Sequence, residues 1–252
     1  MEWDDEAVVL SARTLGESSA VLSALTRAHG RHAGLVRGGS GRRGRGLLQP
    51  GNRVFCHWRA RSAEQLGTFA CELITATAPS VLDDAARLAA VASACAVLDA
   101  ALPEREPATA QHDGLLALLH AVEEDAAWPS VYVRWELALL ADLGFGLDLS
   151  ACAVTGTREG LAFVSPRTGR AVCAAAAAPW QQRLLVLPAF LAGGASAVGH
   201  DEIIAGLALT GHFLRRCIFA EQDRDLPAAR RRLPEVIGRL TARDGGSRDE
   251  KA

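Results

Sequence analysis

The chain has 252 residues, of which 49% are hydrophobic and 22% charged, and its formal net charge at pH 7 is −2. This composition is globular, with apolar residues enough for one large domain or two ordinary ones. The near-neutral total means that any basic surface must arise from local grouping of charge.

Three further features exclude other classes of protein. The N-terminus is acidic (Met1-Glu2-Trp3-Asp4-Asp5-Glu6), unlike a signal peptide. The most apolar stretch, residues 85–101, contains Arg87 and Asp99 and is too short to span a bilayer. The six cysteines are scattered rather than dense, which indicates a reducing compartment. We therefore expect a soluble cytoplasmic protein without a membrane partner.

Short β-branched and apolar runs separated by turns occupy the first third of the chain. We expect strands at residues 6–13, 20–26, 31–37, 53–61 and 66–73. Five short strands at this spacing predict a small barrel of the OB type rather than a βαβ array. The expected fold class is α+β, with this barrel followed by helices.

A Gly/Arg loop at residues 38–46 connects two of the expected strands. Glycine lets a backbone approach a partner closely, and arginine offers a positively charged fork suited to phosphate. Residues 18–63 contain no Asp or Glu, but they contain nine arginines: Arg27, Arg31, Arg37, Arg42, Arg43, Arg45, Arg53, Arg59 and Arg61. Such a segment is typical of a nucleic-acid surface, although a solvated loop would show the same composition.

Six of these arginines are the predicted phosphate contacts. The loop and its flank supply Arg37, Arg42, Arg43 and Arg45, and the fourth strand extends the track with Arg59 and Arg61. Trp58 could offer a base a stacking surface. Burial of Trp58 in the barrel core is the interpretation we favour.

Helical patterns begin after residue 79. Ser80 can cap a helix whose first turn holds Asp83 and Asp84. Residues 103–107 form a linker, and helices are expected at residues 112–127, 130–143, from about 180, 201–220 and 228–240, the last bent or divided by Pro234. The predicted domains are a barrel at 1–79, a helical domain at 80–242 and a flexible tail at 243–252.

A strand-like insert at about residues 147–178 interrupts the helices. It contains Cys152-Ala-Val-Thr155 and Cys173-Ala-Ala-Ala176, each of which has one cysteine where a zinc-binding Cys-x-x-Cys pair has two. Two thiolates cannot complete a tetrahedral site, so we expect no metal and a hairpin held by apolar residues.

Catalytic signatures are missing from the sequence. There is no G-x-S-x-G elbow, P-loop or H-E-x-x-H, and no G-x-G-x-x-G between a strand and a helix. We therefore expect a non-enzymatic protein without a cofactor. Arg134 lies beside aromatic residues on a predicted helix, with Glu136 on a polar side. Arg134 can receive a carboxylate of a partner or form an ordinary surface ion pair.

The order and spacing of several motifs resemble the RecO family of bacterial recombination mediators across nearly the whole chain. The segments that carry the resemblance are Glu17, Thr26-x-x-x-Gly30-Arg31, Gly38 with the arginine loop, Gly46-Leu47-Leu48-Gln49-Pro50-Gly51, Glu72-Leu73, and residues 134–146 followed by Cys152. The sequence departs from the family pattern in two places. Its basic loop has arginine instead of lysine, which preserves the charge, and half of the zinc cysteines found in some members are missing.

The resemblance implies an OB fold joined to a helical domain with a zinc-finger-like insert. It also implies a nucleoid-associated DNA-repair and recombination mediator that binds single- and double-stranded DNA and anneals complementary strands. Its implied partners are RecR and the acidic, Phe-ended tail of the single-stranded-DNA-binding protein, and through them it would assist RecA loading. Arg134 is the one match for the tail-binding residues.

Two other functions remain open. A scaffold whose barrel binds an acidic protein would use the same arginines. An RNA-modifying enzyme with an attached OB barrel would need a cofactor pocket, for which the chain has no motif.

Overall fold

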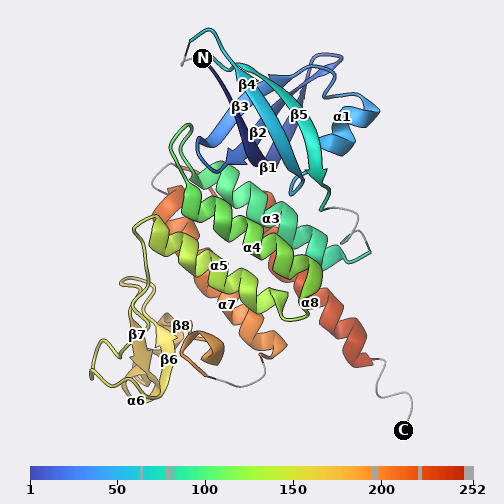
Figure 1. The fold of residues 1–252 in the computed structure, drawn as a ribbon. Coiled ribbons are helices and arrows are strands. Elements are labelled where there is room, and N and C mark those ends of the chain that lie inside the picture. The colour runs from blue at the N-terminus through green and yellow to red at the C-terminus, as the bar shows by residue number, and fades with distance from the viewer. Residues whose placement is uncertain (63–64, 78–80, 82, 195–197, 221–222, 247–252) are drawn as a thin grey trace. The chain divides into compact units, whose positions relative to one another are not determined.

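The computed structural model describes residues 1–62, 65–77, 81, 83–194, 198–220 and 223–246, with residues 240–246 described by their backbone only. The chain divides into two compact units. The first comprises Met1–Glu124 with Pro227–Leu233, and the second comprises Asp125–Leu226 with Pro234–Ala252. Figure 1 shows strands first and helices after them, so the expected α+β class is confirmed. The predicted boundary between residues 79 and 80 lies inside the first unit and stays a prediction.

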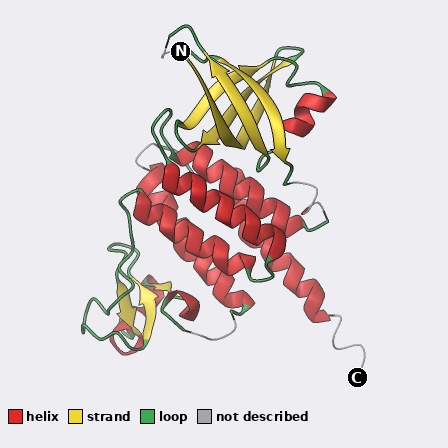
Figure 2. Ribbon diagram, in the orientation of Figure 1, coloured by secondary structure: helices red, strands yellow, loops and turns green. Residues whose placement is uncertain are grey.

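Five strands form the N-terminal part of the first unit (Figure 2). They are β1 (Glu2–Leu15), β2 (Ser19–Thr26), β3 (Gly30–Val36), β4 (Arg53–Arg59) and β5 (Thr68–Thr75). They close into a barrel in the order β1-β2-β3-β5-β4, antiparallel except for β3 and β5. All five predicted strands are present, and the predicted OB-type barrel is confirmed.

The barrel interior is filled by the alternate apolar positions that the sequence displays on its strands. Residues Val54, Cys56 and Trp58 of β4 are all buried. Trp58 is 2% exposed, stacks on Trp3 at a centroid distance of 5.5 Å and donates its indole N–H to the carbonyl of Leu66. Trp58 is therefore a core residue and cannot stack on a base.

The barrel closes through a very short contact between β3 and β5. Only Leu35 with Thr68 and Val36 with Phe69 are paired. Beyond Phe69, residues 70–75 of β5 pair only with β4, among the strands that the structure describes. The chain leaves β3 here because Gly38 turns it at a φ of +74°.

The sequence suggested a loop throughout residues 38–46, but part of this segment is helical. Residues Arg42–Leu47 form a short helix, α1. The side chain of Asn52 donates to the carbonyls of Gly46 and Leu47, and that of Gln49 donates to the carbonyl of Arg45. These bonds satisfy the C-terminal carbonyls of a helix that glycine would otherwise disfavour.

Two further helices, α3 (Ala85–Ala101) and α4 (Thr109–Glu124), belong to the first unit. Asp84 caps α3 by accepting hydrogen bonds from the amides of Ala86 and Arg87, whereas the predicted cap, Ser80, lies outside the described residues. Near the end of α3, the carboxylate of Asp99 accepts from Ser11 at 2.8 Å and Ser23 at 2.5 Å. This helix is thereby attached to strands β1 and β2.

The second unit contains α5 (Trp128–Asp142), α7 (His200–Phe213), a π-helical continuation at Leu214–Phe219, and the insert. In the insert, β6 (Leu161–Val164), β7 (Ala171–Cys173) and β8 (Leu185–Val186) form a sheet in the order β7-β6-β8, and α6 (Ala174–Ala177) follows β7. The helix predicted from about residue 180 is wrong. A single 3-10 turn at Gln181–Arg183 leads into β8, which completes the sheet by pairing with β6.

Two other expectations need correction. The last helix, α8 (Ala228–Gly246), is not divided at Pro234 and extends beyond residue 240, and the alternative of a bend at Pro234 stays a prediction. Residues 247–252 of the predicted tail lie outside the described residues.

Glu136 is not on a polar face but is fully buried, where its carboxylate accepts a 2.5 Å hydrogen bond from the hydroxyl of Thr210 on α7. A buried carboxylate is tolerated because it is hydrogen-bonded.

Among the described residues, no helix combines the length and the apolar character needed to cross a bilayer.

Gly30 provides a test of the barrel's attachment to the segment after α3. Its φ is +66°, and an added Cβ would lie 1.7 Å from the carbonyl oxygen of Glu106. We expect Gly30→Ala to destabilise the protein by at least about 3 kcal/mol, the sum of backbone strain and overpacking. Gly16→Ala is the matched control, because its φ is +64° but open space surrounds it. It should cost about 1–2 kcal/mol. Urea unfolding measures both, and equal losses would contradict the clash.

Candidate nucleic-acid interface

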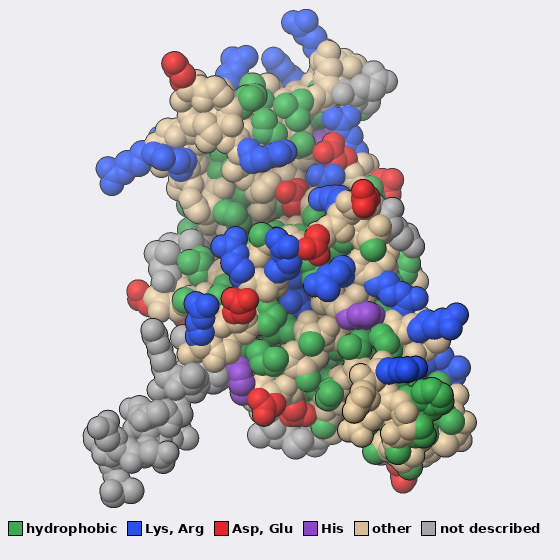
Figure 3. Space-filling model, turned by 180° about the vertical axis from the view of Figure 1, so that it is seen from behind, with side chains coloured by type: hydrophobic (Ala, Val, Ile, Leu, Met, Phe, Trp, Pro, Cys, Tyr) green, Lys and Arg blue, Asp and Glu red, His purple; other side chains and the backbone are tan. Residues whose placement is uncertain are grey.

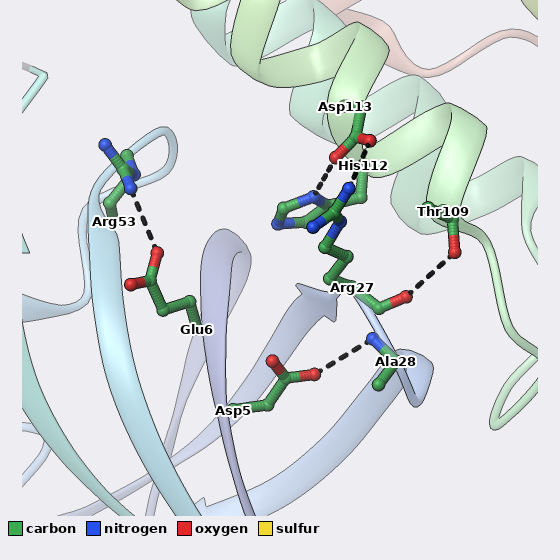
Figure 4. A network of polar contacts seen from close by, with 8 residues as sticks. All are labelled: Asp5, Glu6, Arg27, Ala28, Arg53, Thr109, His112 and Asp113. Atoms are coloured by element: carbon green, nitrogen blue, oxygen red, sulfur yellow. Dashed lines mark hydrogen bonds and ion pairs between the residues drawn. The ribbon is translucent and has the colours of Figure 1, made fainter.

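Three of the nine arginines in the acid-free segment form ion pairs with acidic residues outside it. Arg27 pairs with Asp113 of α4 at 3.1 Å, and Arg53 with Glu6 of β1 at 3.0 Å, as Figure 4 shows. Arg31 pairs with Glu104 at 3.4 Å and donates to the carbonyl of Leu102. These arginines hold elements of the first unit together and are not free to bind phosphate.

Asp113 receives two of the contacts in this network. Its carboxylate lies 3.0 Å from the His112 ring nitrogen as well as 3.1 Å from Arg27. The hydrogen bond from His112 and the charge and hydrogen bond of Arg27 lower the pKa of Asp113. The carboxylate is thus ionised at neutral pH, which keeps the ion pair with Arg27 in place.

The other six arginines have no acidic partner among the described residues, and all six are exposed. They are Arg37, Arg42, Arg43, Arg45, Arg59 and Arg61, the set predicted to contact phosphate. The structure thus separates structural arginines from arginines available to a ligand.

A groove lies between α1 and β5, with a volume of about 1150 Å³. We call it the α1–β5 groove. Arg37, Arg43 and Arg59 line it, together with an apolar set and a few polar residues. The apolar members are Val36, Leu47, Phe69, Ala70, Cys71 and Leu73. The groove exists because β3 does not cover β5 beyond Phe69.

A second hollow adjoins the first and shares Arg37, Arg59 and Thr68 with it. Arg61, Gln65 and the N-terminal residue Met1 also line it. Four of the six predicted arginines therefore lie along one continuous surface. Arg42 and Arg45 are exposed on α1 but line neither hollow.

Acidic residues border this surface on one side. In the β1–β4 register, Glu2 lies opposite Arg59, and Asp4 opposite His57 at 2.6 Å between side-chain atoms. Glu72 is the carboxylate among the residues that line the α1–β5 groove. The carboxylates of β1 therefore disfavour a polyanion over β1, whereas in the groove the one carboxylate among the described lining residues, Glu72, is outnumbered by three arginines.

Positive charge by itself does not single out this region. On the face shown in Figure 3, lysine and arginine side chains are interspersed with acidic ones over the whole visible surface. Within the acid-free segment, the six arginines differ from Arg27, Arg31 and Arg53 in that no carboxylate pairs with them, within the part of the chain that the structure describes.

Arg134, the predicted partner-binding residue, lies on α5 in the second unit. Its guanidinium donates to the carbonyl of Phe190 at 2.9 Å and lies 5.1 Å from the centroid of that ring. An intramolecular contact thus already uses one of its donors and orients it. Its role toward a partner stays a prediction.

The cysteines of the insert lie close together but do not make up a zinc site. The amide of Cys173 donates to the Cys152 sulfur at 3.3 Å, and the Thr155 hydroxyl lies 3.7 Å from the Cys173 sulfur. Hydrogen bonds from Thr155 and from the Cys173 amide lower the pKa of the Cys152 thiol to about 6. No group of three or more metal-binding side chains comes together within the described ranges. The donor set therefore does not fit the tetrahedral zinc of some family members.

Sequence reasoning missed the apolar half of the groove. Leu47 and Leu73 line it but were assigned no role. The exposure of Leu73 follows from the early end of β3, and no sequence signal marks that end as the limit of the barrel closure.

Comparison with known proteins identifies one family over most of the chain. A family model described as Recombination protein O N terminal matches residues 1–77, and one described as Recombination protein O C terminal matches residues 82–224.

Curated relatives match over more than nine tenths of the chain. A protein named DNA repair protein RecO from Rhodospirillum centenum is 56% identical over 235 residues, 92% of this chain and 93% of the relative. Proteins of the same name from Rhodospirillum rubrum and Paracoccus denitrificans are 48% and 49% identical, over 97% and 96% of this chain and 99% and 97% of their own lengths.

The insert provides a testable prediction. The purified protein should contain no stoichiometric zinc, because Cys152 and Cys173 are the only cysteines in the sequence of the insert. The variant T155C/A176C restores both Cys-x-x-Cys pairs and should bind about one zinc per chain. Elemental analysis of both proteins, purified identically, measures this. Stoichiometric zinc in the unmodified protein would show that other side chains complete a site.

Proposed function

The chain belongs to the RecO family of DNA repair proteins, with a role in DNA repair and recombination, and from this we propose that it is a non-enzymatic mediator that binds single- and double-stranded DNA. It anneals complementary strands and assists RecA loading onto DNA covered by single-stranded-DNA-binding protein.

The observation that carries the DNA-binding proposal is the partition of the arginines. Arg27, Arg31 and Arg53 are neutralised by carboxylates, while four unpaired arginines line one surface of the barrel. Guanidinium groups without intramolecular acids are available to neutralise phosphates and to release their counterions. Phosphate contact is independent of sequence, which suits a protein that must act on any damaged site.

Annealing follows from the same charge. Two complementary strands repel each other through their phosphates, and a cationic surface that neutralises part of one strand lowers this repulsion. The chemistry requires no catalytic group, in keeping with the lack of catalytic signatures in the sequence. DNA strands would be held by the arginines of the barrel while base pairing proceeds.

Protein partners are assigned to the helical domain on the basis of the family. These partners are RecR and the acidic tail of the single-stranded-DNA-binding protein, with RecA involved indirectly. Arg134 supports a carboxylate site, since the contact with Phe190 uses one of the five N–H donors of its guanidinium and fixes its direction.

One alternative has specific support. The α1–β5 groove combines three arginines with an apolar lining, and such a groove would also accept an acidic protein segment. In that case the barrel is a protein-interaction scaffold. Competition distinguishes the two functions, because a scaffold would bind an acidic peptide and leave single-stranded DNA unbound.

The test of DNA binding replaces arginines of the shared surface. We expect R37A/R43A/R59A to weaken binding to single-stranded DNA and to reduce the slope of log K against log salt by about 2, roughly 0.7 for each lost phosphate contact. Fluorescence anisotropy across a salt series gives both quantities.

The matched control is R27A/R53A, which removes two arginines that are already ion-paired. Its salt slope should stay close to that of the unmodified protein. Equal reductions in the two variants would mean that the arginines act through net charge alone, and an unchanged slope in the first variant would remove the surface from DNA binding.

A further inference from the structure

The inner face of β5 becomes progressively exposed along its length. In the β4–β5 register, Cys71 lies opposite Cys56 and Leu73 opposite Val54. Paired residues of an antiparallel ladder point to the same side of the sheet, and Cys56 and Val54 are fully buried in the barrel. Cys71 and Leu73 therefore belong to the inner face as well.

Burial along this face depends on β3. Phe69, which is paired with β3, is 4% exposed, whereas Leu73, four residues on, is 50% exposed. Leu73 is an inner-face residue without the strand that would cover it. Exposed leucine in such a position is costly in water and marks a surface that a ligand can cover.

Cationic residues line the same groove as this apolar floor. Arg37 and Arg43 come from the loop and helix on one side of the α1–β5 groove, and Arg59 from β4. Each nucleotide of a single DNA strand offers a matching partner for both parts of the groove: a phosphate for the arginines and an exposed base face for the apolar floor. A duplex has the phosphates, but its base faces are stacked in its interior.

On the premise of the proposed DNA binding, we infer that the apolar floor of the α1–β5 groove, which includes Leu73, receives bases of a single strand while the arginines bind its phosphates. The apolar contact adds an affinity that a duplex cannot gain. Leu73 is thus a specificity-determining residue that favours single strands over duplex.

Neighbouring residues of β5 provide a matched pair of variants. Leu73 lines the groove, whereas Ile74 is 42% exposed but lies outside the groove lining. Leu73→Thr and Ile74→Thr make the same kind of change and keep a residue that favours strands. Circular dichroism and thermal unfolding check that both variants fold.

Binding is measured with a short oligothymidylate, an abasic oligonucleotide of the same length and a blunt duplex. We expect L73T to weaken oligothymidylate binding by roughly threefold, in line with the loss of part of a buried leucine contact. The salt slope and the affinities for the abasic strand and the duplex should not change, because these report phosphate contacts. I74T should behave like the unmodified protein.

Photo-cross-linking gives a second readout that does not depend on a small affinity change. An oligonucleotide with 5-iododeoxyuridine should cross-link to residues 70–73, and the same base within a duplex should not. Cross-links confined to other elements would overturn the inference, as would an L73T variant that binds oligothymidylate as I74T does.

The other occupant of the groove is an acidic peptide. If a peptide of alternating glutamate and leucine binds, and L73T weakens it while oligothymidylate binding is unchanged, the groove is a peptide site and the inference is wrong. If the unmodified protein shows no salt-dependent binding to any of the three nucleic acids, the proposed DNA binding itself is wrong. This outcome differs from failure of the inference about Leu73, in which DNA binding remains.

Discussion

The short parallel contact between β3 and β5 is the constraint on which the arginine-lined groove of the barrel depends. Two residue pairs close the barrel, and β3 then turns away at Gly38. Because no described strand other than β4 pairs with residues 70–75, the inner face of β5 opens into a groove next to α1. A longer β3 would have buried Leu73 and left only outward-facing arginines. The length of β3 thus determines both how the barrel closes and which residues line the groove.

Charge pairing then decides which arginines can serve a ligand. Arg27, Arg31 and Arg53 contribute to the packing of the first unit, through carboxylates on β1, α4 and the segment after α3. The acidic residues of β1 also border the arginine surface at β4, which directs a polyanion toward the β5 side. A family defined by DNA repair is consistent with this surface, and the finer roles are the proposals made above.

The insert of the second unit shows how a small sheet persists with half of its metal-binding cysteines. Cys152 and Cys173 are buried in an apolar cluster, to which Leu161 and Phe163 add partly buried side chains. Thr155 contacts the Cys173 sulfur through its hydroxyl, at the position where a zinc-binding pair would place a second thiolate. Apolar packing and three short strands thus hold together an insert for which the resemblance implies a zinc-finger-like motif.

The sequence by itself determined the order of elements, because strand alternation, helix periodicity, glycine turns and family motifs are local properties. It also marked the segment of nine arginines, through the absence of acidic residues along it, whereas the pairing of Arg27, Arg31 and Arg53 with carboxylates is seen only in the structure. It could not determine the burial of Glu136, the helical character of α1, or β8 in place of a helix, since each depends on a partner distant in sequence: Thr210, Asn52 and β6. Only the tertiary structure brought the acidic residues of β1 beside β4 and left Leu73 uncovered, because spatial neighbours and strand closure are set by packing between segments.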